Sequence, residues 1–537
     1  MKNATAYAVT SSRKPQYSKV FSTDMSIKAK SLSGIGWLSF ANSANQLTTL
    51  VVFVILARHL TLEQFGLVML AVLINNVFTI VFKEGIVDFI IRSDDDPGGD
   101  TTATAFWLLL MLAALCVAIQ SGVIAPFVDH FFSADTSVYL AAMSPIIVLN
   151  AMSVVNLANA RKKFNFKISA LRNFINGLLT GIVAIVMALL GYGAWSLIIS
   201  RVAGALGSAV ILWHEEPYRP QLIFNVKHAK RIVSYSAPIL QFRLLSYLSG
   251  RMPEFLLAAF AGPAALAIYR VGGRLIEAVN SLLLDSIANV LVTTFAKLRE
   301  RDTIEPYIRV TSALLAILAP IYVGCGAIAP ELTHVLYGEK WAESSIVLTF
   351  LSLQIVPAVL KMVAITLFKT RDRTSKLRTL GILDIVSSAL FALTATTGSP
   401  STVAAAVVIS AFLTCVFYLA ASQKAFGISG ASVVKGGSPY CIASLAMFAV
   451  VYPLAGLLLS HMPPLAAAMV AALIGALIYA AIILVFFRKQ SLSLLAELLF
   501  LLPTRLKKLF VKREIMPAEE GKKVSGVPTP PSRSSSD

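Results

Sequence analysis

The chain has 537 residues, of which 57% are apolar and only 14% are charged, and its mean hydropathy is +0.75. A soluble globular protein carries roughly 25% charged residues, so this composition excludes an ordinary soluble fold. The formal net charge of +18 does not indicate nucleic-acid binding, because the basic residues lie mainly in alternate loops, as they do in membrane proteins.

A polar N-terminal tail precedes a series of apolar blocks, each long enough to cross a hydrocarbon core of about 30 Å as a helix. The blocks predict an all-α polytopic membrane protein of about 14 transmembrane helices. The predicted spans are 34–57, 65–91, 102–125, 138–158, 169–190, 192–213, 235–260, 264–296, 308–329, 342–368, 378–397, 401–421, 438–459 and 464–487.

The distribution of Lys and Arg predicts the orientation of these spans. By our count, 36 of the 46 basic residues fall in one set of alternating segments and eight fall within spans. Only Arg58 and Lys340 fall on the opposite side. Both termini are therefore expected in the cytoplasm, with an even number of spans between them.

A weak internal repeat relates residues 56–67, after span 1, to residues 257–268, after span 7. Six spans separate the copies, which predicts two six-helix lobes related by an axis along the membrane normal, plus two C-terminal helices. The expected segments are a cytosolic tail at 1–31, a first lobe at 32–213, a cytoplasmic linker at 214–234, a second lobe at 235–421, the last two spans within 438–487, a basic amphipathic segment at 488–515 and a disordered cytosolic tail at 516–537.

Ionisable side chains inside spans 7 and 8 are the strongest functional signal. Charges at membrane depth cost a few kcal/mol each, so they normally face a cavity or a partner. On span 8, one helical stripe carries Arg270, Arg274, Glu277, Ser281 and Asp285. The alternative is that the two arginines extend to the membrane interface or simply pair with the glutamate.

Further polar residues lie in other spans, and together the set suggests a cavity that binds an anion. The candidate substrate-binding cations are Arg243, Arg251, Arg270, Arg274, Lys361, Arg201 and Lys83. The candidate polar lining residues are Asn42, Gln46, Tyr247 and Ser281, for some of which ordinary interhelical hydrogen bonding is the alternative. The candidate sites for a coupling ion, H⁺ or Na⁺, are Glu254, Glu277, Asp285 and Asp88.

Nothing in the sequence indicates catalysis, a metal site or another cofactor. The four cysteines, Cys116, Cys325, Cys415 and Cys441, lie far apart inside apolar blocks and have no metal-ligand spacing. The chain carries no nucleotide-binding loop and no nucleophile motif. We therefore expect a transporter and not an enzyme.

Three stretches resemble the polysaccharide transport family, the Wzx-type flippases of the multidrug/oligosaccharidyl-lipid/polysaccharide (MOP) superfamily. Residues 54–67, VILARHLTLEQFGL, are similar to the family pattern ILAR-L-EDFG. Residues 85–92, GIVDFIIR, look like the family's end of span 2, with Asp88 as a departure. Residues 261–271, AGPAALAIYRV, are similar to GP--LG-Y--A, with Ala267 in place of the usual Gly.

This resemblance implies a bacterial inner-membrane flippase with a cation-lined central cavity that opens alternately to either side. The implied substrate is an undecaprenyl-diphosphate-linked oligosaccharide for exopolysaccharide, capsule or O-antigen (lipopolysaccharide) synthesis, with the exopolysaccharide and capsule branch the most similar. The implied partners are membrane lipids, a glycan polymerase and a chain-length regulator, and no nucleic acid.

Three other functions remain open from the sequence. A cation-coupled drug antiporter of the same superfamily shares the lobes but usually has twelve spans and a less cationic cavity. A glycan polymerase should carry a large outer loop, and the loops here are short. A scaffold for other glycan enzymes has no need of charges inside the membrane.

Overall fold

The computed structural model describes residues 44–83, 85–93, 99–132, 134–299, 303–371 and 373–487, and their regular secondary structure is entirely helical. This confirms the predicted all-α fold class. The chain up to Ile482 clusters into one compact unit, and the residues from Ile483 onward form a second. The predicted segments 1–31, 488–515 and 516–537 lie outside the described residues.

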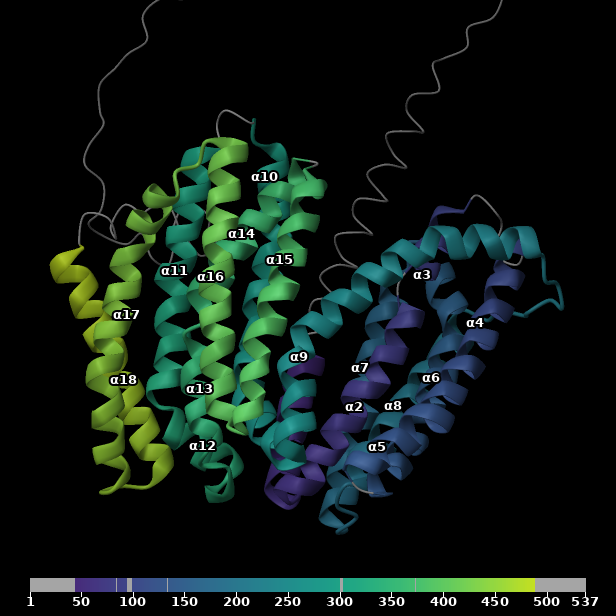
Figure 1. Ribbon diagram of the computed structural model, residues 1–537, viewed down its shortest axis with the longest axis horizontal. Coiled ribbons are helices and arrows are strands. Elements are labelled where there is room, and N and C mark those ends of the chain that lie inside the picture. The colour runs from purple at the N-terminus through teal and green to yellow at the C-terminus, as the bar shows by residue number, and fades with distance from the viewer. Residues whose placement is uncertain are drawn as a thin grey trace, which may run out of the picture. The chain divides into compact units, whose positions relative to one another are not determined.

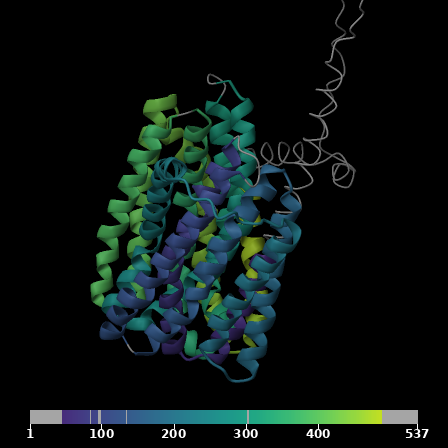
Figure 2. The ribbon, with the colours of Figure 1, turned by 90° about the vertical axis from the view of Figure 1, so that its right-hand side faces the viewer.

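The segment predicted as the first lobe, whose bounds stay a prediction, begins within the described residues with a helix through residues 44–59. The helices that follow are α2 (Leu62–Lys83), α3 (Ile86–Arg92), α4 (Asp100–Ile119), the π-helical turn η1 (Gln120–Ile124), α5 (Ala125–Phe131), α6 (Ala134–Lys162), α7 (Phe166–Leu189) and α8 (Trp195–Glu215). Helix α7 packs along α8, and α6 contacts α2, α4 and α8. These helices form one group in which most run roughly parallel (Figures 1 and 2).

Helix α9 (Val226–Val279) is two helices joined at a break. Gly262 has φ 83° and ψ 176°, which are not helical values, and Pro263 follows it. Glycine adopts a positive φ without the steric cost that a Cβ brings, and proline cannot donate the backbone hydrogen bond that would continue the first helix. The first half contains predicted span 7, and the second half is the first part of predicted span 8, which continues beyond α9 to residue 296.

The second lobe continues from α9 through helices that lie side by side in a second group (Figure 1). They are the π-helical turn η2 (Asn280–Leu284), α10 (Asp285–Lys297), α11 (Ile304–Ala327), α12 (Ala329–Tyr337), the 3₁₀ turn η4 (Glu339–Trp341), α13 (Ser344–Ser352), α14 (Ile355–Thr370), α15 (Thr374–Ala392), the 3₁₀ turn η5 (Leu393–Thr397) and α16 (Pro400–Phe426). The last two helices are α17 (Gly430–Leu459) and α18 (Pro464–Phe486).

Eleven helices among the described residues are long and apolar enough to cross a membrane. The number becomes twelve when α13 and α14, bent by 45°, are taken as one broken span. The difference from the predicted fourteen has two sources. Predicted span 7 and the first part of predicted span 8 lie in one helical stretch, Val226–Leu284, which counts once. Span 1 (34–57) is only partly described, so the count of fourteen stays a prediction.

The distribution of apolar side chains is that of a membrane protein. Large side chains such as Met111, Leu115 and Val416 are exposed along long helices, where lipid can cover them and the helix satisfies its own backbone. The main core cluster includes Leu56 and Phe65 of the first lobe and Trp341 of the second. The two lobes therefore share one buried contact near the start of α2.

Candidate functional site

Three arginines and two glutamates from the two halves of α9 form one ion-pair cluster. Arg251 Nη1 lies 2.5 Å from Glu254 Oε1 and 2.6 Å from Glu277 Oε1. Arg270 Nη1 lies 3.1 Å from Glu254 Oε2 and 3.5 Å from Glu277 Oε1. Arg274 Nη1 lies 3.4 Å from Glu277 Oε2. Because the chain bends between the two halves of α9, side chains up to 26 positions apart meet here.

Arg251 and Arg270 each bridge both carboxylates, and Arg270 is the more buried of the two arginines. Its side chain is 13% exposed, and that of Glu254 is 5% exposed. Burying a charge is costly unless it is paired, so the cluster holds each carboxylate with at least two guanidinium groups. A cavity of about 220 Å³ borders the cluster, and its polar lining includes Arg251, Glu254, Arg270, Glu277, Gln354 and Ser388.

A second, smaller cavity of about 70 Å³ joins the cluster to the first lobe. Arg270 and Arg274 line it together with Arg201 of α8. Hydroxyl-bearing residues complete its polar lining, namely Thr48, Thr49, Thr180 and Ser200. The ring of Phe53 also lines it, and the Arg274 guanidinium lies 5.4 Å from the centre of that ring. The cavity is therefore built from both lobes.

Several guanidinium N–H groups at this small cavity have no hydrogen-bond acceptor among the described residues. They are Nε of Arg201, Nε of Arg270, and Nε and Nη2 of Arg274, and all are buried. Buried donors without an acceptor cost about 1–3 kcal/mol each. Four guanidinium groups against two carboxylates also leave an excess of two positive charges. The arrangement is suited to a bound dianion with several acceptor oxygens.

Lys361 belongs to a separate polar group inside the second lobe. Its Nζ lies 2.7 Å from Asp384 Oδ1, and it lies 5.5 Å from the centre of the Tyr418 ring. The Tyr418 hydroxyl donates to Asp384 Oδ2 over 2.8 Å. Helices α14, α15 and α16 each contribute one of the three side chains. Lys361 is thus already held by an internal carboxylate.

Two predicted lining residues bond to the backbone. The Tyr247 hydroxyl donates to the Leu73 carbonyl of α2 over 3.0 Å, and it connects the first half of α9 to the first lobe. The Ser281 hydroxyl donates to the Ala278 carbonyl of its own helix over 3.1 Å.

The remaining predicted residues are not among the five members of the cluster, and the side chains of some of them are not described. Arg243 is exposed two turns before Arg251, Gln46 is half-buried on the first helix, and Asp88 is exposed in the first turn of α3. Asn42 lies outside the described residues, and the side chains of Lys83 and Asp285 are likewise not described.

Sequence reasoning did not assign Asp384, Tyr418 or the hydroxyl groups of Thr180 and Ser200 to a site. Asp384 carried a signal, because it is an acidic residue inside an apolar span. Its partner lies 23 positions away on another helix, so helical periodicity alone does not pair the two. Within the described residues, no group of three or more His, Cys, Asp or Glu side chains is placed to hold a metal ion.

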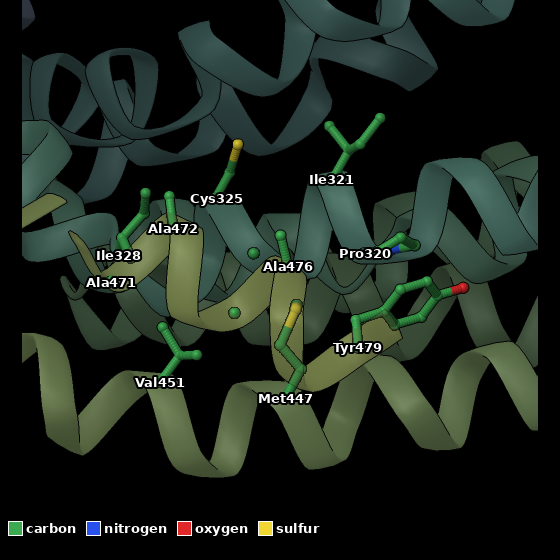
Figure 3. Close-up of a pocket in the computed structure, with 12 residues that line it drawn as sticks. Pro320, Ile321, Cys325, Ile328, Met447, Val451, Ala471, Ala472, Ala476 and Tyr479 are labelled. Atoms are coloured by element: carbon green, nitrogen blue, oxygen red, sulfur yellow. The ribbon is translucent and has the colours of Figure 1, made fainter. Parts of the chain in front are cut away.

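A third cavity, of about 380 Å³, is apolar and lies between α11, α17 and α18 (Figure 3). Met447, Val451 and Ile328 line it, and so does Cys325, which is a free thiol. The Tyr479 hydroxyl donates to the Ala316 carbonyl over 2.7 Å and so holds α18 against α11. With no charged side chain in its lining, this cavity is chemically distinct from the arginine site.

Comparison with known proteins identifies related sequences. The family model described as "Polysaccharide biosynthesis protein" matches residues 55–346, a range that contains all five members of the ion-pair cluster. The succinoglycan biosynthesis transport protein ExoT of Rhizobium meliloti is 25% identical over 332 residues, which cover 61% of this chain and 67% of the relative.

Solved structures share the fold. The lipid II flippase MurJ, in an inward closed conformation, superimposes with a TM-score of 0.65 at 16% identity, over 84% of this chain and 99% of that chain. An inward-facing multidrug resistance MATE family transporter of the MOP superfamily gives a TM-score of 0.55 at 13% identity, over 71% of this chain and 94% of that chain. At these identities the likeness shows the fold alone, and the fold is that of MOP transporters.

Proposed function

We propose a transport function for this chain, which belongs to the family of polysaccharide biosynthesis proteins. The chain is a multi-pass membrane protein with the MOP transporter fold. We infer that it moves an oligosaccharide carried on undecaprenyl diphosphate from the cytoplasmic to the outer leaflet of a bacterial inner membrane. It acts as a transporter and not as an enzyme, and a glycan polymerase with its chain-length regulator receives the translocated unit.

The observation that carries this proposal is a set of buried guanidinium N–H groups that have no acceptor among the described residues, on three arginines that line the cavity between the lobes. Arg201, Arg270 and Arg274 line one cavity, and the wider cluster has an excess of two positive charges. A lipid-linked diphosphate brings two negative charges and several acceptor oxygens, which guanidinium groups bind in a bidentate manner. The sugars pass between the lobes while the lipid tail stays in the bilayer.

The same cluster offers a means of coupling to an ion. Glu254 and Glu277 are the internal counter-charges of the arginines when no substrate is bound. A substrate diphosphate competes with both carboxylates for Arg251 and Arg270, and H⁺ or Na⁺ then supplies the missing counter-charge. Such exchange gives the two states of the transporter different affinities for the substrate, which is what a shift between states requires.

Binding of a lipid diphosphate to the purified full-length protein tests the proposal. We expect undecaprenyl diphosphate to bind more tightly than the uncharged alcohol of the same length, and Arg274→Ala to weaken that binding about tenfold, since a charge-assisted hydrogen bond contributes about 1.5–3 kcal/mol. The matched control is Lys424→Ala, which removes an exposed cation at the end of α16. Equal affinity for the charged and uncharged lipids, or equal binding by both variants, would contradict the proposal.

A drug antiporter is the second candidate, because the MATE transporter shares the fold. The positive excess of the cluster opposes a cationic cargo, since like charges placed together repel each other. Cells that express the chain should therefore show unchanged resistance to cationic dyes and drugs. A several-fold rise in resistance that Arg274→Ala abolishes would favour the antiporter.

A further inference from the structure

Five hydrogen bonds among the described residues connect the end of the first helix with the segment from α12 to η4, about 280 positions later. Arg58 Nε donates to the Leu336 carbonyl over 2.9 Å, and its Nη2 donates to the Val335 carbonyl. Lys340 Nζ donates to the carbonyls of Arg58, over 2.8 Å, and Leu60, over 2.7 Å. The fifth bond comes from the indole of Trp341.

The two cations act reciprocally on the ends of two helices. The last carbonyls of a helix have no partner within it and carry a partial negative charge, which favours a nearby cation. Lys340 of the second lobe binds carbonyls at the C-terminal end of helix 44–59, and Arg58 of the first lobe binds carbonyls in the last turn of α12. Each lobe therefore caps a helix of the other.

Trp341 adds buried apolar surface to the same contact between the lobes. It is fully buried, and its Nε1 donates to the Ala57 carbonyl over 2.8 Å. Its ring meets Phe65 edge to face, with centroids 5.4 Å apart. Next to Phe65, Gly66 lies so close to the second lobe that a Cβ there would stand 1.9 Å from the Pro263 carbonyl oxygen. Separating the lobes here would expose these carbonyls and the indole together.

Arg58 and Lys340 are also the two basic residues on the side that the Lys and Arg distribution predicts to be extracytoplasmic. That side is normally poor in Lys and Arg, and the structure uses both of these exceptions to join the lobes. We propose that Arg58, Lys340 and Trp341 form an outer latch that keeps the extracytoplasmic ends of the two lobes closed. The latch deepens the proposed transport function, because it must open before cargo leaves on that side.

Access to the arginine cavity from outside tests the latch without any substrate. The full chain, with its four cysteines replaced by serine, receives Thr49→Cys, which lines the cavity beside Arg270 and Arg274. Intact cells are treated with a thiol reagent that does not cross the membrane. We expect Arg58→Ala/Lys340→Ala to raise the labelling rate about tenfold or more, since each lost hydrogen bond to a charged group shifts the equilibrium by about that factor. Trp341→Phe should give a smaller rise.

The control is Glu339→Ala, because Glu339 lies in the same turn as Lys340 but takes part in none of the five hydrogen bonds described above. This variant should be labelled at the same rate as the parent chain. The thermal unfolding midpoint of each purified variant shows that it is folded, and labelling by a membrane-permeant reagent shows that the introduced thiol can react. Arg58→Ala/Lys340→Ala labelling at the rate of Glu339→Ala would overturn the latch. That result would leave the binding of lipid diphosphate unaffected, so the failure of the latch and the failure of the proposed function are distinguishable.

Discussion

Removing Arg270 should destabilise the protein because it takes one of the two partners from a deeply buried carboxylate. Glu254 is 5% exposed and pairs with Arg270 over 3.1 Å and with Arg251 over 2.5 Å. Deleting one member of a buried ion pair costs about 3–5 kcal/mol. Since Arg251 keeps its contact with Glu254, we expect the lower end for Arg270→Ala, about 3 kcal/mol in the free energy of unfolding.

A second substitution separates this structural cost from the loss of a binding group. In Arg270→Ala/Glu254→Gln, the carboxylate that lost its partner is neutral, so about half of the lost stability should return, while diphosphate binding stays weak. Chemical denaturation of the purified protein in detergent measures the stability. The exposed Lys424→Ala should change it by less than about 0.5 kcal/mol. The reasoning would be refuted if Arg270→Ala were as stable as Lys424→Ala, or if Arg270→Ala/Glu254→Gln were no more stable than Arg270→Ala.

Three further substitutions probe other parts of the account. Lys361→Met should lower the midpoint of thermal unfolding because Asp384 loses its cation. Lys361→Met/Asp384→Leu should restore part of the loss, since the buried charge is gone but the Tyr418 hydroxyl has lost its acceptor; no recovery would contradict the pairing. Gly66→Ala should cost about 1–3 kcal/mol in a denaturation experiment, since the added Cβ meets the backbone of Pro263; unchanged stability would contradict that contact. Burial raises the pKa of the Glu331 carboxyl, which lies outside the candidate spans. Above pH 4.5 this carboxyl ionises more readily in the unfolded chain than in the folded protein, so the folded protein is less stable there than at lower pH. Glu331→Gln should therefore raise the unfolding midpoint more at pH 8 than at pH 5, and an equal change at both would refute this.

Helical periodicity was sufficient to group part of the site in advance. Arg270, Arg274 and Glu277 share one stripe of span 8 and meet in the structure. Periodicity did not specify which residues of span 7 meet that stripe. The structure brings Arg251 and Glu254 there and leaves Arg243 exposed, because the break at Gly262 fixes how the two halves of α9 cross.

Contacts between distant segments could not be predicted from the sequence. The charge distribution singled out Arg58 and Lys340 as exceptions, but nothing local indicates that each binds carbonyls about 280 positions away. Backbone carbonyls are present at every residue and leave no signal in the sequence. Similarly, the hydroxyl groups of Thr180 and Ser200 become part of the arginine cavity only because the fold brings α7 and α8 to the cavity that Arg270 and Arg274 line.

In the proposed function, the chain moves lipid-linked oligosaccharide across the membrane with the help of its arginine cluster. This function is tested most directly by sorting that lipid by leaflet in a deletion strain carrying wild type, no chain, or Arg270→Ala/Arg274→Ala. We expect complete repeat units to accumulate in the cytoplasmic leaflet of the last two strains, and surface polymer to be lost. Single repeat units that reach the outer leaflet and remain unpolymerised would contradict the claim and indicate a polymerase.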